Sequence, residues 1–306
     1  FLPSVRGELN YCLRGCYTSM ARFKFAYRKT EAGIYRGETA CAAAQALTGK
    51  RHVVPAEAWD GLLFNTFHDI LPGSSIERAY DEQIEWLGGV AHTARRAEHE
   101  ALREMAAGID TTVAKPPPDH AAPVPFLIFN PHPWRMRCHV ELESSLDYRP
   151  IWPFKDNPDK VPVVVTGPDG LPTPHQLVAT EHSCTFGGLP WRKRTVVPVD
   201  LPPLGWNVYT MGWSDKPVPV PTPVIPVRST AHGISGGGCA VEARPGNNGV
   251  MVRIGGRHLF ATRGLHMITV DDPWGSWGDM QETTAGTHLN HMRHSWRITA
   301  VKALEH

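Results

Sequence analysis

The sequence lacks a long apolar run, and it also lacks a basic stretch followed by an apolar one of the kind that opens a secreted protein. A membrane-spanning helix needs about 20 consecutive apolar residues, and a signal peptide needs both of those parts. We therefore expect neither a transmembrane span nor a signal peptide, and no membrane partner.

Neither sign of charge is in excess. The 306 residues include 31 basic and 30 acidic side chains, and the formal net charge is +1. Proteins that bind nucleic acid or an anionic surface gather basic residues into patches. The balance gives no electrostatic argument for a nucleic-acid partner, and the length allows about two or three domains.

Cysteine is also scarce. The chain has six cysteines, scattered without a paired framework, which favours reduced thiols and a cytoplasmic location. Cys12 and Cys16 have a spacing that a metal could use, but no second pair follows, so we favour ordinary thiols over a zinc knuckle. No internal repeat of fixed period is present.

A helical pattern extends from Tyr17 to about Ile109, where prolines occur only at breaks. We expect the first helix to begin near Thr18 and to end before the turn at Thr48–Arg51. Gly33 and Gly37 lie inside it and weaken the prediction that it is continuous. Its apolar stripe consists of Met20, Phe23, Tyr27, Ile34, Cys41 and Ala44.

Two further helices are predicted. The second has Pro55 at its first position and runs to the break at Pro72–Gly73. The third follows directly, because Ser74 and Glu77 have the spacing of a capping box. The residues expected to be buried are Trp59, Leu62, Leu63 and Phe67 in the second helix, and Ile76, Tyr80, Ile84, Leu87, Ala91 and Ala94 in the third. Three such helices form a bundle.

A proline-rich linker at Asp110–Pro125 marks the clearest domain boundary, because it cannot continue a helix. A second proline-rich segment follows at Pro217–Pro226. The strands predicted beyond the first linker are Phe126–Phe129, His139–Glu143, Val161–Val165, Arg194–Val199 and Gly249–Ile254. The fold class is therefore α+β and multidomain, with a three-helix bundle followed by antiparallel β-sandwich domains.

The most informative motif is F-N-T-F-H-D-I-L-P-G-S-S-I at Phe64–Ile76. The imidazole of His68, near a helix end, can project from the bundle to bind a metal, and the carboxylate of Asp69 can contact a hydroxyl-rich ligand. A lone His-Asp pair at a helix end is more often solvated or capping.

The motif resembles the hallmark of the central domain of glycoside hydrolase family 38 α-mannosidases. By that resemblance His68 is a zinc ligand and Asp69 a substrate contact. Similar family segments occur in the same order elsewhere, at Arg14–Glu31, Leu127–Trp134, Leu201–Tyr209 and Asp271–Asp279.

The resemblance also divides the chain. It implies the tail of an N-terminal catalytic domain at 1–16, the central three-helix bundle at 17–112, a linker at 113–125, a small β domain at 126–215 and the start of a large C-terminal β-sandwich at 216–306. The turn-rich opening at Phe1–Asn10 and the ending Ala303–His306 agree with a fragment.

The family's chemistry is zinc-dependent retaining hydrolysis of terminal α-D-mannosyl residues. Its barrel supplies a His-x-Asp pair and an aspartate nucleophile, and we find neither before Arg14. The resemblance thus implies no catalytic residue in this chain, weak or absent zinc binding, and an inactive fragment. The implied partners are an α-mannoside or mannosyl oligosaccharide and the parent's own N-terminal catalytic domain, with homo-oligomer formation left open.

Other motifs have plainer interpretations. His288, His291 and His294 recur every three residues, but their flanks predict a loop and then a strand, which would scatter the imidazoles. Trp274 and Trp277 could stack on sugars, although tryptophan in a β-sandwich is more often core. The alternative to an enzyme fragment is a non-catalytic carbohydrate-binding or scaffold protein.

Overall fold

The computed structural model describes residues Ser4, 14–118, 120–147, 151–157, 160–180, 191–214, 227–260, 264–270 and 293–301. The chain divides into two compact units. One comprises Phe1–Arg103 with Arg228–Lys302, and the other comprises Glu104–Val227 with Ala303–His306. Each group of elements is described by itself.

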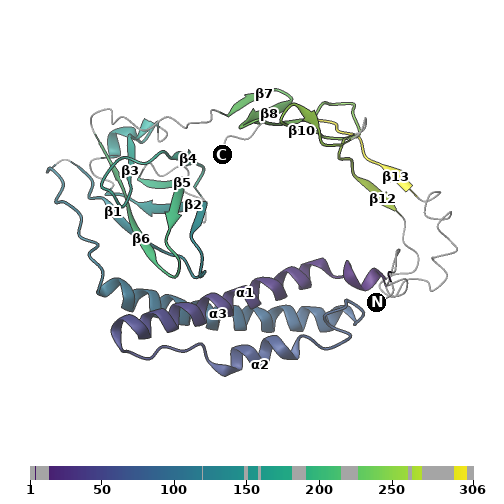
Figure 1. Ribbon diagram of the computed structural model, residues 1–306, viewed down its shortest axis with the longest axis horizontal. Coiled ribbons are helices and arrows are strands. Elements are labelled where there is room, and N and C mark those ends of the chain that lie inside the picture. Colours follow the sequence, from purple (N-terminus) through teal and green to yellow (C-terminus); the bar gives the residue numbers. More distant parts are fainter. Residues whose placement is uncertain are drawn as a thin grey trace. The chain divides into compact units, whose positions relative to one another are not determined.

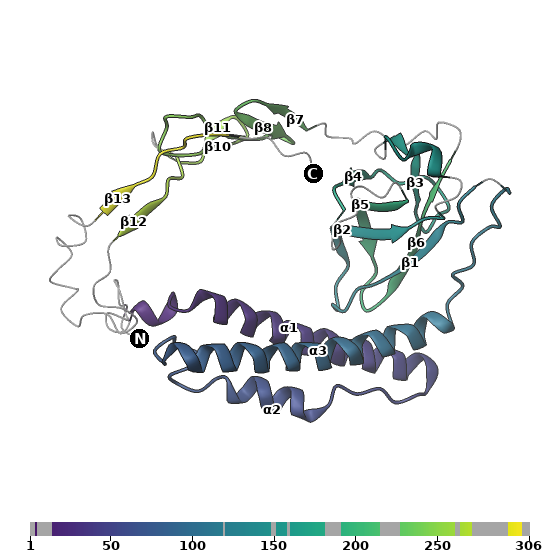
Figure 2. The same cartoon turned by 180° about the vertical axis from the view of Figure 1, so that it is seen from behind.

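The N-terminal elements form a three-helix bundle (Figure 1). A 3-10 turn at Arg14–Tyr17 precedes α1 (Ala21–Thr48), α2 (Ala56–Phe64) and α3 (Glu77–Ala107). The reverse view also shows α1 lying along α3, with α2 beside them (Figure 2). All three helices contribute to one apolar core, which contains Phe23, Tyr27, Ile34, Ala58, Leu62, Ile70, Tyr80, Leu87, Val90 and Ala94.

The first helix is continuous in spite of its two glycines. Gly33 and Gly37 are both buried within it. A Cβ added at Gly37 would lie 2.9 Å from Cγ2 of Val54 and 3.1 Å from the carbonyl oxygen of Ala94. Glycine at position 37 therefore lets α1 approach the backbone of α3 closely.

The second helix is shorter than the sequence pattern predicts. It ends at Phe64, and the buried Asn65 caps it by donating a side-chain hydrogen bond of 2.8 Å to the Gly61 carbonyl oxygen. Turns then replace the helix as far as Gly73. The predicted burial of Leu63 and Phe67 is wrong, since they are 55% and 51% exposed.

The third helix begins at Glu77, and the first helical backbone bonds run to the carbonyl of Ile76. The predicted capping box at Ser74 is wrong, because the Ser74 hydroxyl contacts Asp69 instead. Ile76 is 70% exposed, contrary to expectation, whereas Tyr80 and Leu87 are buried as predicted.

The next elements form an antiparallel β-sandwich, as expected. One sheet has the order β1-β6-β3 and the other β2-β5-β4. Their bounds are β1 Val124–Phe129, β2 Met136–Ser145, β3 Val163–Thr166, β4 Gln176–Val178, β5 Arg192–Leu201 and β6 Trp206–Trp213, with a 3-10 turn at Trp152–Phe154. The shared core combines residues of both sheets, including Leu142, Val165, Val197, Tyr209 and Met211.

A meander of short strands follows, in the order β11-β10-β9-β8-β7. The strands are β7 Arg228–Thr230, β8 Gly233–Gly236, β9 Cys239–Glu242, β10 Met251–Ile254 and β11 Arg257–His258. A separate antiparallel pair joins β12 Ile268–Val270 to β13 Arg293–Ser295. The chain thus has the α+β class predicted from its sequence. Among the described residues, no helix is both long and apolar enough to cross a membrane.

Candidate functional site

His68 and Asp69 lie in the turns between α2 and α3, beyond the end of α2 rather than on its last turn. The His68 side chain is 79% exposed, and its Nε2 is 3.5 Å from Oδ2 of Asp69. The imidazole ring packs against the phenyl ring of Phe67, with 4.4 Å between ring centroids. The structure therefore brings the two predicted site residues together and leaves the imidazole accessible.

The buried hydroxyl of Tyr80 supports this loop from α3. It lies 3.0 Å from the carbonyl oxygens of both Asp69 and Ile70, and it accepts a hydrogen bond of 3.2 Å from the Ser75 backbone N–H. Burial raises the pKa of Tyr80, which keeps the hydroxyl protonated as a donor. The backbone at Asp69 is thus fixed by a residue of the bundle core.

Lys24 supports the loop from the other side. Its Nζ donates hydrogen bonds to the carbonyl oxygen of Pro72, at 3.1 Å, and to that of Ser19. Burial lowers the pKa of Lys24, and Cys16 opposes that shift. Gly73 has a φ of +93°, and a Cβ there would lie 2.6 Å from Cβ of Ser19. Only glycine fits this close approach between the loop and the start of α1.

The Asp69 carboxylate already accepts one hydrogen bond within the protein. Its Oδ1 accepts a hydrogen bond of 3.4 Å from the Ser74 hydroxyl, and the side chain is 39% exposed. A carboxylate can accept about four hydrogen bonds, so Asp69 retains capacity for hydroxyl donors of a ligand.

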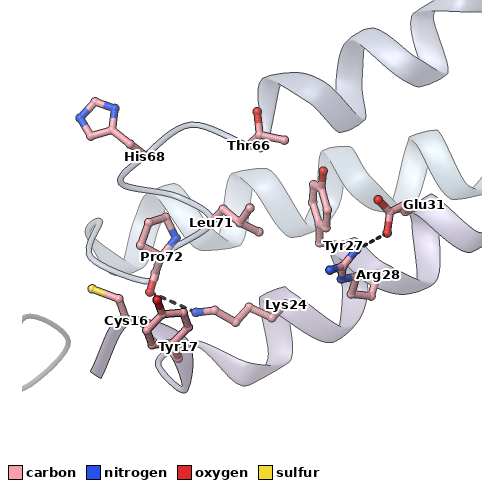
Figure 3. Close-up of a pocket in the computed structure, with 10 residues that line it drawn as sticks. All are labelled: Cys16, Tyr17, Lys24, Tyr27, Arg28, Glu31, Thr66, His68, Leu71 and Pro72. Carbon is pink, nitrogen blue, oxygen red and sulfur yellow. Dashed lines mark hydrogen bonds and ion pairs between the residues drawn. The ribbon is translucent and has the colours of Figure 1, made fainter. Parts of the chain in front are cut away.

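A hollow of about 890 Å³ opens beside this loop, between it and one face of α1 (Figure 3). Ligand pockets commonly measure about 300–1,000 Å³. Arg28 Nη1 and Glu31 Oε2 form an ion pair of 2.6 Å along the α1 wall. The lining consists of Cys16, Tyr17, Lys24, Tyr27, Arg28, Glu31, Thr66, His68, Leu71 and Pro72.

A metal ion needs about three or four protein ligands in fixed geometry. The described part of the chain contains no group of three His, Cys, Asp or Glu side chains that could hold one. His68 fits the role of a single exposed donor, with Asp69 next to it.

Two of the other candidate side chains lie in the described part of the chain. His294 lies on β13, paired with Thr269, and Cys16 lies in the wall of the hollow. The remaining candidates fall outside the described residues: Cys12, Trp274, Trp277, His288, His291 and the segment Asp271–Asp279. Sequence reasoning missed the support by Tyr80, which periodicity placed in the core without a polar role.

The helical part of the chain is similar to known α-mannosidases. A family model described as the α-mannosidase middle domain matches residues 12–105, which contain α1, α2, most of α3, the His68 loop and the lining of the hollow. An α-mannosidase of Saccharomyces cerevisiae is 33% identical over 118 residues, which are 37% of this chain and 10% of the relative. The chain therefore matches only a small part of that relative's length.

Solved structures share the fold. A protein in glycosyl hydrolase family 38 from Enterococcus faecalis superposes with a TM-score of 0.57 at 17% identity, covering 82% of this chain and 30% of its own. An α-mannosidase from Enterococcus faecalis V583 gives a TM-score of 0.56 at 17% identity, covering 78% and 28%. Residues 12–105 thus match the middle domain of α-mannosidases, and the chain shares its fold with these two structures.

Proposed function

We propose that the chain is part of a zinc-dependent retaining α-mannosidase that removes terminal α-D-mannosyl residues from a glycoside or oligosaccharide. The observation that carries this proposal is the His68–Asp69 pair, which projects an accessible imidazole from a loop that Lys24 and Tyr80 hold at Pro72 and Asp69. This loop lies within the segment that matches the α-mannosidase middle domain.

His68 supplies one ligand and Asp69 one substrate contact in this proposal. The remaining ligands and the nucleophile come from a separate catalytic domain of the parent protein. The 118 residues matched in the yeast α-mannosidase are 10% of that protein, so most of its length lies outside the match.

The residues of this chain then have definite tasks. His68 presents its accessible imidazole, and Asp69 accepts hydrogen bonds from mannose hydroxyls with the oxygen capacity that Ser74 leaves open. Lys24 and Tyr80 hold the loop so that both groups keep their orientation. When bound, zinc would hold mannose hydroxyls and favour a distorted ring.

The chemical step belongs to the parent. A carboxylate attacks the anomeric carbon and forms a covalent intermediate while a second carboxyl group protonates the departing oxygen. The second group then takes a proton from water as the water displaces the first carboxylate, so that the configuration is retained. Both carboxyl groups are proposed to lie in the catalytic domain, so the isolated chain should be inactive.

The test compares the isolated chain with the full-length parent on p-nitrophenyl α-mannoside. We expect the parent to release p-nitrophenol and to lose activity with a chelator, and the isolated chain to release none. Turnover by the isolated chain would refute the division of catalytic groups. A parent that binds mannosides but hydrolyses none would favour the non-catalytic alternative.

A cytoplasmic location is also proposed, from the state of the cysteines. Cys41, Cys138 and Cys239 are thiols in the described structure, and Cys41 is buried. Reduced thiols are typical of cytoplasmic proteins.

A further inference from the structure

The hollow beside His68 is larger than the His68 side chain alone would need, and charged, aromatic and apolar side chains line it. It measures about 890 Å³ and is bounded by α1 on one side and by the loop at Thr66, His68 and Pro72 on the other. Figure 3 shows Tyr27 and the Arg28–Glu31 pair along the helix wall, with Thr66 and His68 on the loop. The hollow therefore continues directly from the proposed metal ligand.

The two cations that line the hollow are already engaged within the protein. Arg28 pairs with Glu31 at 2.6 Å, and Lys24 donates to the carbonyl oxygens of Ser19 and Pro72. A phosphate or carboxylate ligand would have to compete with these partners for charge. A neutral ligand would not, because it can add hydrogen bonds to the pair without breaking it.

The Arg28–Glu31 pair offers both kinds of hydrogen-bonding group that a sugar hydroxyl uses. A guanidinium has five N–H donors and a carboxylate about four acceptor positions, far more than the single short contact between the two side chains consumes. Tyr17, which is 69% exposed, adds an aromatic surface to the lining. Aromatic faces pack well against the apolar face of a pyranose ring.

We propose that this hollow binds the neutral sugar on the leaving-group side of the scissile bond, with the Arg28–Glu31 pair as its hydroxyl-binding element and Tyr17 as its stacking surface. The inference rests on the proposed function, because only then does His68 mark where the terminal mannose lies. The pair would thereby select oligosaccharides over glycosides whose leaving group has no hydroxyls.

The experiment uses the full-length parent and two substrates, an α-linked mannose disaccharide and p-nitrophenyl α-mannoside. The measured quantity is the ratio of kcat/KM for the disaccharide to kcat/KM for the aryl mannoside. Loss of a hydrogen bond to a charged group is expected to lower this ratio about tenfold in Arg28→Met and in Glu31→Gln. Tyr17→Leu should lower it in the same direction.

The matched control is another exposed ion pair, on α3. Arg78 Nε and Glu82 Oε1 are 3.0 Å apart, and neither residue lines the hollow. Arg78→Met should leave the ratio unchanged. Thermal unfolding of each variant identifies any that fail to fold, and Tyr17→Leu, at an exposed position, keeps the test available in that case.

The outcomes separate the two proposals. Equal losses on both substrates, or no loss on either, in an active parent would overturn the leaving-group site and leave the proposed function standing. Inhibition by inorganic phosphate that Arg28→Met abolishes would show an anion site and would also overturn it. A parent that turns over neither substrate would refute the proposed function and this inference with it.

Discussion

Replacing Tyr80 by phenylalanine removes one hydroxyl and tests how the His68 loop is held. The ring is 2% exposed and packs edge to face on Phe23, with 5.5 Å between centroids, so the substitution keeps the apolar contacts. The hydroxyl accepts from the Ser75 N–H and lies 3.0 Å from the Asp69 and Ile70 carbonyl oxygens. Leaving such groups unpaired in the interior costs about 1–3 kcal/mol.

We therefore expect Tyr80→Phe to lower the free energy of unfolding of the bundle by about 1–3 kcal/mol, measured by urea denaturation of this chain with helical circular dichroism at 222 nm. The same substitution in the full-length parent should weaken zinc binding, because the backbone that carries His68 and Asp69 loses its support from α3. Tyr35→Phe is the matched control on the surface of α1, where the side chain is 47% exposed and the expected change is below about 0.5 kcal/mol. A Tyr80→Phe chain as stable as the parent sequence, with unchanged zinc affinity, would refute the reasoning.

Further predictions concern the scaffold. Gly37→Ala should destabilise the bundle by about 1–2 kcal/mol, because overpacking against α3 outweighs the gain in helix propensity. Gly33→Ala should stabilise it by up to about 1 kcal/mol, because the nearest atom to an added Cβ is 4.0 Å away. Shifts of the same sign in the urea midpoints of the two variants would contradict this. Asn130→Ala should cost the sandwich about 2–3 kcal/mol, since its buried amide donates to two carbonyl oxygens, and a loss under about 0.5 kcal/mol would be inconsistent with that role. Hydrogen bonds, first from Arg135, hold the pKa of Asp200 below its usual range. Asp200 therefore stabilises the fold above about pH 4 and loses that effect as the pH falls further. In thermal melts at a series of pH values, Asp200→Asn should reduce this acid sensitivity, and an unchanged pH profile would count against the prediction.

The main helices could be predicted from the sequence because their burial follows the helical period. Phe23, Ile34 and Ala44 recur at helical spacing and are buried, and the turn after Thr48 coincides with the end of α1. The roles of Gly33 and Gly37 inside α1 could not be predicted from the helical period. The close contact that requires Gly37 involves Ala94, far along the chain, and local propensity contains no information about it.

The loop after α2 was the part that periodicity described least well. Phe67 has helical spacing from Leu63, but the side chain of Asn65 bonds back to the helix and ends it. The two supports of the loop come from other helices: Lys24 reaches it from α1, which precedes the loop, and Tyr80 from α3, which follows it. Sequence motifs could therefore identify His68 and Asp69, while their geometry depends on tertiary contacts.

Strand prediction was incomplete, because it missed β6, Trp206–Trp213, as well as the short β4. The longer apolar segments in β1, β2 and β5 were predicted, but β4, at Gln176–Val178, is too short to produce an alternating pattern. Pairing with β5 stabilises it.

The central claim is that His68 contributes a zinc ligand to the parent enzyme, and the zinc content of purified full-length His68→Ala tests it most directly. His99→Ala, at an exposed position on α3, serves as the matched control. Loss of one ligand from a set of about four should sharply reduce bound zinc after dialysis, while the control retains it. Zinc content equal to that of the unmodified parent in His68→Ala would remove His68 from the ligand set and contradict the account.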